Sequence, residues 1–157
     1  MSALKNSALI FRFRVAMTFF IIGLVISGVT AFPLLLEVRL LEKLLGGGFW
    51  ISHVREGLET TYARYPWIAY GTDWLAFGHL VIAMFFVGPL VNPLTSRPNL
   101  ITGIVACVAI FPLAMICGPL RGIPVYWRLI DCSFGVIGII PLVYCLRLLG
   151  KMEKSSG

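Results

Sequence analysis

The stretch "VAMTFFIIGLVISGVTAFPLLL", residues 15–36, decides the fold class of this chain. It contains 22 residues, and none of them is ionisable. A helix of about 20 predominantly apolar residues is long enough to cross the hydrocarbon core of a bilayer, which is roughly 30 Å thick. The stretch therefore predicts a membrane-spanning helix.

The same stretch has features of a secretory signal peptide. Arg12 and Arg14 precede the apolar run, and Val29-Thr30-Ala31 resembles a cleavage site. Because the sequence still carries this segment behind Met1, we expect it to stay in the protein as a helix.

Three more apolar runs follow, at Thr72–Val91, Leu100–Gly118 and Leu129–Leu149. The whole chain is 59% hydrophobic and only 13% charged, and its mean hydropathy is +0.92. This composition is too apolar for a soluble protein of 157 residues. We expect one all-α membrane domain, residues 1–157, with four spans.

Each run carries a stripe of small or polar residues at helical spacing. The clearest members are Ala76, His79 and Ala83 in the second run, and Asp131 and Gly135 in the fourth. Small residues let membrane helices approach closely and gain dispersion contacts. The stripes predict an integral membrane four-helix antiparallel bundle, and Pro112 and Pro141 predict kinks in the last two helices.

An amphipathic cap, residues 37–71, is expected between the first two spans. "LLLEVRLLEKLL" (34–45) has the apolar and charged periodicity of an interfacial helix. The glycines at 46–48 predict a hinge, and a second amphipathic helix over 51–65 should end at Pro66.

The distribution of charge predicts the orientation. The two termini and the 92–99 loop carry seven basic residues and one acidic residue, whereas the opposite side carries six of each. Arg12 and Arg14, next to the first span, favour cytoplasmic termini and an extracytoplasmic cap. The net charge of +6 then lies beside anionic lipid, so nucleic-acid binding is not needed to explain it.

Two histidines are candidates for metal or haem ligation. His79 lies about 10 Å below the predicted extracytoplasmic boundary, and His53 and Glu56 lie at i and i+3 in the cap. His53, Glu56 and His79 would form a metal site if the cap folds over the bundle, or the two histidines would hold a b-type haem. The alternative is that His79 hydrogen-bonds a neighbouring helix while His53 is solvated.

Four charged residues are expected near the same boundary: Asp73, Arg121, Arg128 and Asp131. Ionisable groups within a membrane are costly and mark functional sites. The two arginines could bind a phosphate or carboxylate in bidentate fashion. The alternative is structural pairing of Arg128 with Asp131 and of Arg121 with Asp73.

Cys117 and Cys132 lie near the same boundary, where a disulfide would be permitted. The helical wheel argues against it, because it places Cys117 on the packed stripe and Cys132 on a lipid-facing side. No CxxC motif is present, so a thiol-oxidising enzyme is not indicated.

The span from about 65 to 148 contains "YGTDWLAFGH", "GPL", "RGIP" and "WRLIDCSFG". With these motifs it resembles a group of small uncharacterised bacterial integral membrane proteins. The resemblance implies location in the bacterial cytoplasmic membrane and brings no activity.

Two functions are consistent with these patterns. In the first, a polar extracytoplasmic pocket binds a small ligand, metal or haem through His79, Asp73, Asp131, Arg121 and Arg128. In the second, the protein is a structural or accessory subunit that packs against partner membrane subunits or a second copy of itself. Catalysis with His79 as a general base beside Asp73 or Asp131 is a third option, but no substrate is specified.

Overall fold

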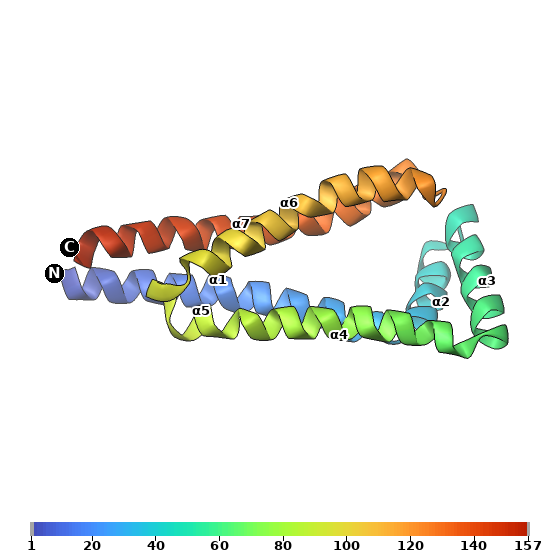
Figure 1. The fold of residues 1–157 in the computed structure, drawn as a ribbon, viewed down its shortest axis with the longest axis horizontal. Coiled ribbons are helices and arrows are strands. Elements are labelled where there is room, and N and C mark those ends of the chain that lie inside the picture. The colour runs from blue at the N-terminus through green and yellow to red at the C-terminus, as the bar shows by residue number, and fades with distance from the viewer. Residues whose placement is uncertain (1, 157) are drawn as a thin grey trace. The chain divides into compact units, whose positions relative to one another are not determined.

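A computed structural model describes the backbone of residues 2–156 and the side chains of residues 6–155. The regular structure in this part of the chain is helical throughout (Figure 1). The helices are α1 (Ser2–Ala31), α2 (Leu34–Leu45), α3 (Phe49–Arg64), α4 (Ala69–Phe85), α5 (Val87–Val91), α6 (Arg97–Leu120) and α7 (Val125–Ser156), with 3-10 turns η1 (Pro66–Ile68) and η2 (Pro93–Thr95).

Four helical segments are long and apolar enough to cross a membrane. They are Asn6–Ala31, Pro66–Val91, Arg97–Leu120 and Val125–Ser155. Within the described residues, the prediction of an all-α chain with four candidate spans is therefore confirmed, and this is consistent with a multi-pass membrane protein.

The predicted C-terminal end of the first span was wrong. Helix α1 ends at Ala31, and Leu34–Leu36 already belong to α2. Pro33 separates the two helices because it has no N–H to donate and disfavours a helical conformation of the residue before it. The apolar run therefore extends beyond the C-terminal end of α1.

The second predicted span is also interrupted. Helix α4 ends at Phe85 and α5 begins at Val87. Pro89 has no N–H to donate to the Phe85 carbonyl one turn earlier. That carbonyl instead accepts a hydrogen bond from Asn99 Nδ2 at 3.4 Å. In contrast, α6 and α7 continue through Pro112 and Pro141.

The chain divides into two compact units. Unit 1 comprises Met1–Ile21 with Met84–Gly157, and unit 2 comprises Ile22–Ala83. The boundaries fall within α1 and near the end of α4. The antiparallel four-helix bundle stays a prediction.

In unit 1, α6 and α7 approach closely through glycines of the predicted stripe. A Cβ atom on Gly135 would lie 2.7 Å from the carbonyl oxygen of Cys107, and one on Gly138 would lie 2.9 Å from Cys107 Sγ. Neither distance is a normal carbon contact, so only glycine permits this approach.

The most tightly packed part of unit 1 is the end that carries the chain termini, where α1 and α7 lie side by side (Figure 1). The side chains buried there are Phe13, Met17, Cys145, Leu148, Leu149 and Met152. The Cys145 thiol contacts the Phe13 carbonyl at 3.6 Å. Arg97 of α6 pairs with Glu153 of α7 at the surface of this end.

In unit 2, Gly28 of α1 packs on α4, where an added Cβ would lie 2.9 Å from the Ala76 carbonyl oxygen. Helices α2 and α3 lie across the end of this pair (Figure 1). The predicted helix 34–45 coincides with α2, and Gly46 and Gly47 form the predicted turn with φ of 75° and 71°.

Ion pairs join α2 to α3. Arg55 Nε lies 2.6 Å from Glu42 Oε2, Arg55 Nη1 lies 2.6 Å from Glu59 Oε2, and Arg39 Nε lies 2.8 Å from Glu59 Oε1. Hydrogen bonding from Arg39, together with the charge of Arg55, lowers the pKa of the Glu59 carboxyl. Neither helix contains a buried residue, so charged contacts are prominent in the cap.

Candidate functional site

The turn between α6 and α7 has a well-defined backbone geometry. The Ile123 N–H donates to the Gly118 carbonyl at 2.9 Å, and the Gly122 N–H donates to the Pro119 carbonyl at 3.1 Å. Gly122 adopts a φ of 68°, which residues with a side chain rarely tolerate. These two bonds form the Schellman motif that ends a helix and fixes its exit direction. Arg121, immediately before Gly122, is thereby held at the end of α6.

Gly118 also makes room for a side chain of α7. A Cβ atom on Gly118 would lie 2.2 Å from Arg128 Cδ and 2.7 Å from Arg128 Cγ. The aliphatic part of Arg128 therefore lies directly on the backbone of α6. Its Nε atom is buried and has no hydrogen-bond partner within the described part of the chain.

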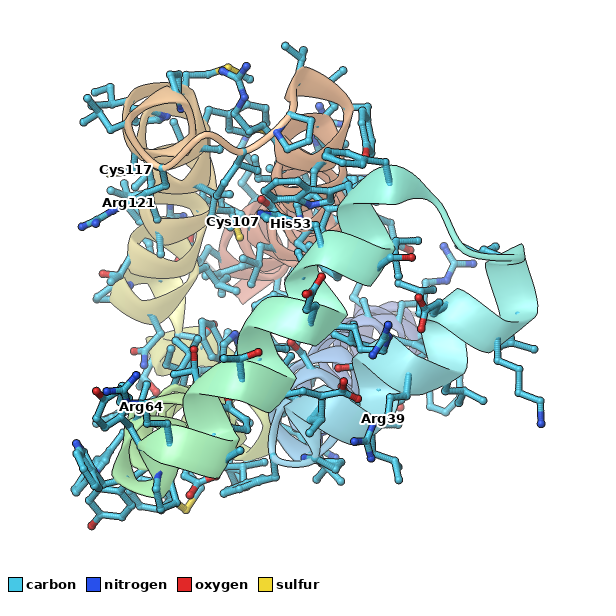
Figure 2. The ribbon with its side chains drawn as sticks, turned by 90° about the vertical axis from the view of Figure 1, so that its right-hand side faces the viewer. Arg39, His53, Arg64, Cys107, Cys117 and Arg121 are labelled. Carbon is cyan, nitrogen blue, oxygen red and sulfur yellow. The ribbon has the colours of Figure 1, made fainter. Side chains whose placement is uncertain are left out.

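A surface hollow of about 220 Å³ lies beside this contact. Three of its lining residues are charged: Arg121, Arg128 and Asp131. The remaining lining residues are Ile110, Leu113, Ala114, Cys117, Gly118 and Ile123. We call it the α6–α7 hollow. Figure 2 shows Cys117 and Arg121 at this end of α6, with the Arg121 side chain extending away from the ribbon.

The three charged side chains of the α6–α7 hollow are not paired with one another. Among the described residues, the ion pairs are those of Arg39, Arg55 and Arg97 with glutamates. The predicted structural pairing of Arg128 with Asp131 was therefore wrong, although the two residues are one helical turn apart. Their charges remain available to a ligand.

Asp73, the fourth member of the predicted charged group, lies in the first half of α4 and is half-buried. It belongs to unit 2, whereas Arg121 belongs to unit 1. Its pairing with Arg121 and its participation in a shared site stay predictions.

His79 lies in α4 and is half-buried. Its Nδ1 lies 2.9 Å from the Leu75 carbonyl oxygen of the same helix. Because a carbonyl oxygen only accepts, Nδ1 carries the proton and donates. The imidazole is thus bound within its own helix, and not to a neighbouring one as the structural alternative predicted. In the neutral ring Nε2 keeps its lone pair.

The predicted metal ligands His53 and Glu56 are both on α3 and are exposed. The His53 ring stacks on Phe49, with centroids 5.9 Å apart and planes 5° apart. Within the described part of the chain, no group of three or more His, Cys, Asp or Glu side chains is arranged to hold a metal ion. Ligation by His53, Glu56 and His79, and haem binding by the two histidines, stay predictions without support from this geometry.

For the two cysteines near the hollow, the burial in the structure is the opposite of the predicted burial. Cys132 is buried and Cys117 is exposed, and both are free thiols. The helical wheel had placed Cys117 in the packed stripe and Cys132 toward lipid, which was wrong for both.

A larger hollow of about 530 Å³ lies in unit 1 where α5, η2 and α6 meet. Three of its polar side chains bond to backbone: Asn99 to Phe85, Ser96 to Pro93, and Thr95 to Asn92. It is the weaker candidate because no charged side chain lines it.

Sequence reasoning found the charged residues of the α6–α7 hollow but missed the role of Gly118. Its position before Pro119 indicated only a helix end, and no pattern signals that an arginine ten residues later lies on it. The cap ion pairs were missed as well, although Arg55 and Glu59 have the i, i+4 spacing of a helical pair.

Comparisons with protein-family models, curated proteins and solved structures found no match. The resemblance to small bacterial integral membrane proteins therefore stays a prediction.

Proposed function

We propose that this multi-pass membrane protein binds a small anionic ligand in the α6–α7 hollow. Arg121 and Arg128 are the cationic contacts, and Asp131 limits which anions fit. The observation that carries the proposal is the position of these three charges around one hollow, without an ion-pair partner among the described residues. A charge at the edge of a bilayer is costly when it is unpaired, so a ligand of complementary charge is stabilised there.

The proposed ligand class follows from the arginines. A guanidinium presents parallel N–H donors that match the oxygens of a phosphate or carboxylate. The contact with Gly118 supports this role, because it restricts the Arg128 stem and lowers the entropy lost when the ligand binds. His79, His53 and Glu56 lie outside this proposal. The predicted orientation places the site on the extracytoplasmic side.

Thermal unfolding of the full chain in a neutral detergent tests the proposal. We expect inorganic phosphate to raise the Tm above its value in chloride of equal ionic strength, because a ligand that binds only the folded state stabilises it by mass action. Arg128→Gln should abolish the difference.

Two further variants make the test specific. Gly118→Ala keeps every charge but places a methyl group against the Arg128 stem, so it should also weaken the phosphate effect. Arg147→Gln removes an exposed charge at the opposite end of α7 and should leave the effect intact. If Arg147→Gln and Arg128→Gln reduce the effect equally, the phosphate acts on net charge only, and the accessory-subunit function is favoured instead.

A further inference from the structure

The lining of the α6–α7 hollow changes in character along the helix axis. Arg121 and Arg128 lie at the turn end, Asp131 lies about one helical turn farther along α7, and Ile110, Leu113 and Ala114 line the part farther along α6. Ile110 is eight residues before Gly118, which corresponds to about 12 Å along a helix. The two arginines therefore lie at the end of the spans and the apolar lining of α6 extends toward their middle, which suits an amphiphile at a membrane boundary.

The size of the hollow limits which part of an amphiphile it can hold. Its volume is about 220 Å³, and a water molecule occupies about 30 Å³ in the liquid. That space accommodates a headgroup and not a whole lipid. Leu113, Ile116 and Leu120 are exposed at 61%, 62% and 78% and continue the apolar surface along α6. An acyl chain would leave the hollow over this surface.

The charges of the hollow select among headgroups. Two guanidiniums attract a phosphate, but the Asp131 carboxylate in the same lining repels a headgroup that is only anionic. A primary ammonium next to the phosphate provides the opposite charge for Asp131, and it brings N–H donors for the carboxylate oxygens. A trimethylated ammonium has no such donors.

We propose that the α6–α7 hollow binds the headgroup of a membrane phospholipid that carries both a phosphate diester and a primary ammonium. The phosphate contacts Arg121 and Arg128, and the ammonium contacts Asp131. This inference rests on the proposed anion-binding function and adds the class of ligand.

Lipid retention measured by native mass spectrometry tests the inference. The full chain in a mild detergent is given equal amounts of phosphatidylethanolamine, phosphatidylglycerol and phosphatidylcholine with identical dioleoyl tails. We expect phosphatidylethanolamine to be retained about tenfold more than the other two lipids, the effect of one additional charge-assisted hydrogen bond.

Single substitutions test which residue contacts the phosphate and which contacts the ammonium. Asp131→Asn should reduce retention of phosphatidylethanolamine to the level of the other two lipids. Arg128→Gln and Gly118→Ala should lower retention of all three, and Arg147→Gln should change none. Far-UV circular dichroism and the Tm identify any variant that fails to fold, and in that case the unaltered chain still tests the lipid preference.

The possible failures can be separated. If phosphatidylglycerol is retained as well as phosphatidylethanolamine while Arg128→Gln weakens both, the ammonium inference is overturned and anion binding stands. If Arg128→Gln weakens no lipid and also leaves the phosphate effect on the Tm unchanged, both proposals are overturned.

Discussion

The two ends of α7 differ in how they contact the rest of unit 1. At the end near the termini, Leu148, Leu149 and Met152 of α7 are buried, and so is Phe13 of α1, which contacts Cys145. At the turn end, α6 and α7 form a hollow that is lined in part by Arg128 and Asp131. One continuous helix therefore has a closely packed end and an open, charged end.

We expect the two ends of α7 to have different roles: the terminal end in the stability of unit 1, and the turn end in ligand binding. Closely packed side chains lose dispersion contacts when they are truncated, so the terminal end should determine the stability of unit 1. Charges without partners add little to stability but are available to a ligand, so substitutions at the turn end should change binding more than folding. The following predictions test this division.

The largest expected effect is at the packed end. Leu149→Ala removes a fully buried side chain, whereas Leu129→Ala removes one that is 56% exposed. Truncating a buried leucine costs about 2–5 kcal/mol through lost contacts and the cavity left behind. We expect a clear fall in the Tm in detergent for Leu149→Ala and a much smaller one for Leu129→Ala. Equal falls would show that the packed end does not dominate stability.

The second prediction compares two glycines of α7, one in close contact with α6 and one without a close neighbour. Gly135→Ala places a methyl group 2.7 Å from the Cys107 carbonyl oxygen, so the two backbones must separate. Overpacking of this kind costs about 1–3 kcal/mol. Gly150→Ala on the same helix meets no atom within 4 Å and should be neutral or stabilising by up to about 1 kcal/mol. A stable Gly135→Ala variant would mean that α6 and α7 are not in tight contact there.

The smallest effect is expected in the cap, which has ion pairs and no buried residue in α2 or α3. Because folding lowers the pKa of Glu59, its stabilising contribution is complete above the ordinary glutamate pKa of about 4.3 and is lost as the pH falls through the lower folded value. Glu59→Gln should lower the Tm near pH 6, and its difference from the unaltered chain should disappear in acid.

Glu56→Gln is the matched control for the cap. It removes the same charge from the same helix at an exposed position, and no ion pair within the described residues involves Glu56. Its Tm should follow that of the unaltered chain at every pH. A loss as large as that of Glu59→Gln would assign the effect to net charge and not to the ion pairs.

The part of the fold that the sequence predicted well is the part governed by local chemistry. The run of leucines and charges in 34–45 predicted α2 to the residue, and Pro66 marked the end of α3 correctly. The error at Pro33 arose because an apolar run indicates only hydrophobicity, whereas a proline interrupts hydrogen bonding inside it.

The charged residues of the α6–α7 hollow were also identified from sequence, because arginine and aspartate are rare at the ends of apolar spans. What could not be predicted is that Arg128 lies on Gly118 and makes no pair with Asp131. Both features depend on the distance between α6 and α7. That distance is set elsewhere along the two helices, where Gly135 lies against the backbone of Cys107.

By itself, the sequence determined that this chain forms four apolar helices, a charged cap and a turn rich in arginine. The tertiary structure alone decided which side of each helix is packed, as the exposure of Cys117 and the burial of Cys132 demonstrate. The physical reason is that lipid and a neighbouring membrane helix are equally apolar, so hydrophobicity cannot distinguish the two faces. Only specific close contacts, such as that of the Arg128 side chain with Gly118 and that of the Cys107 backbone with Gly135, make that distinction.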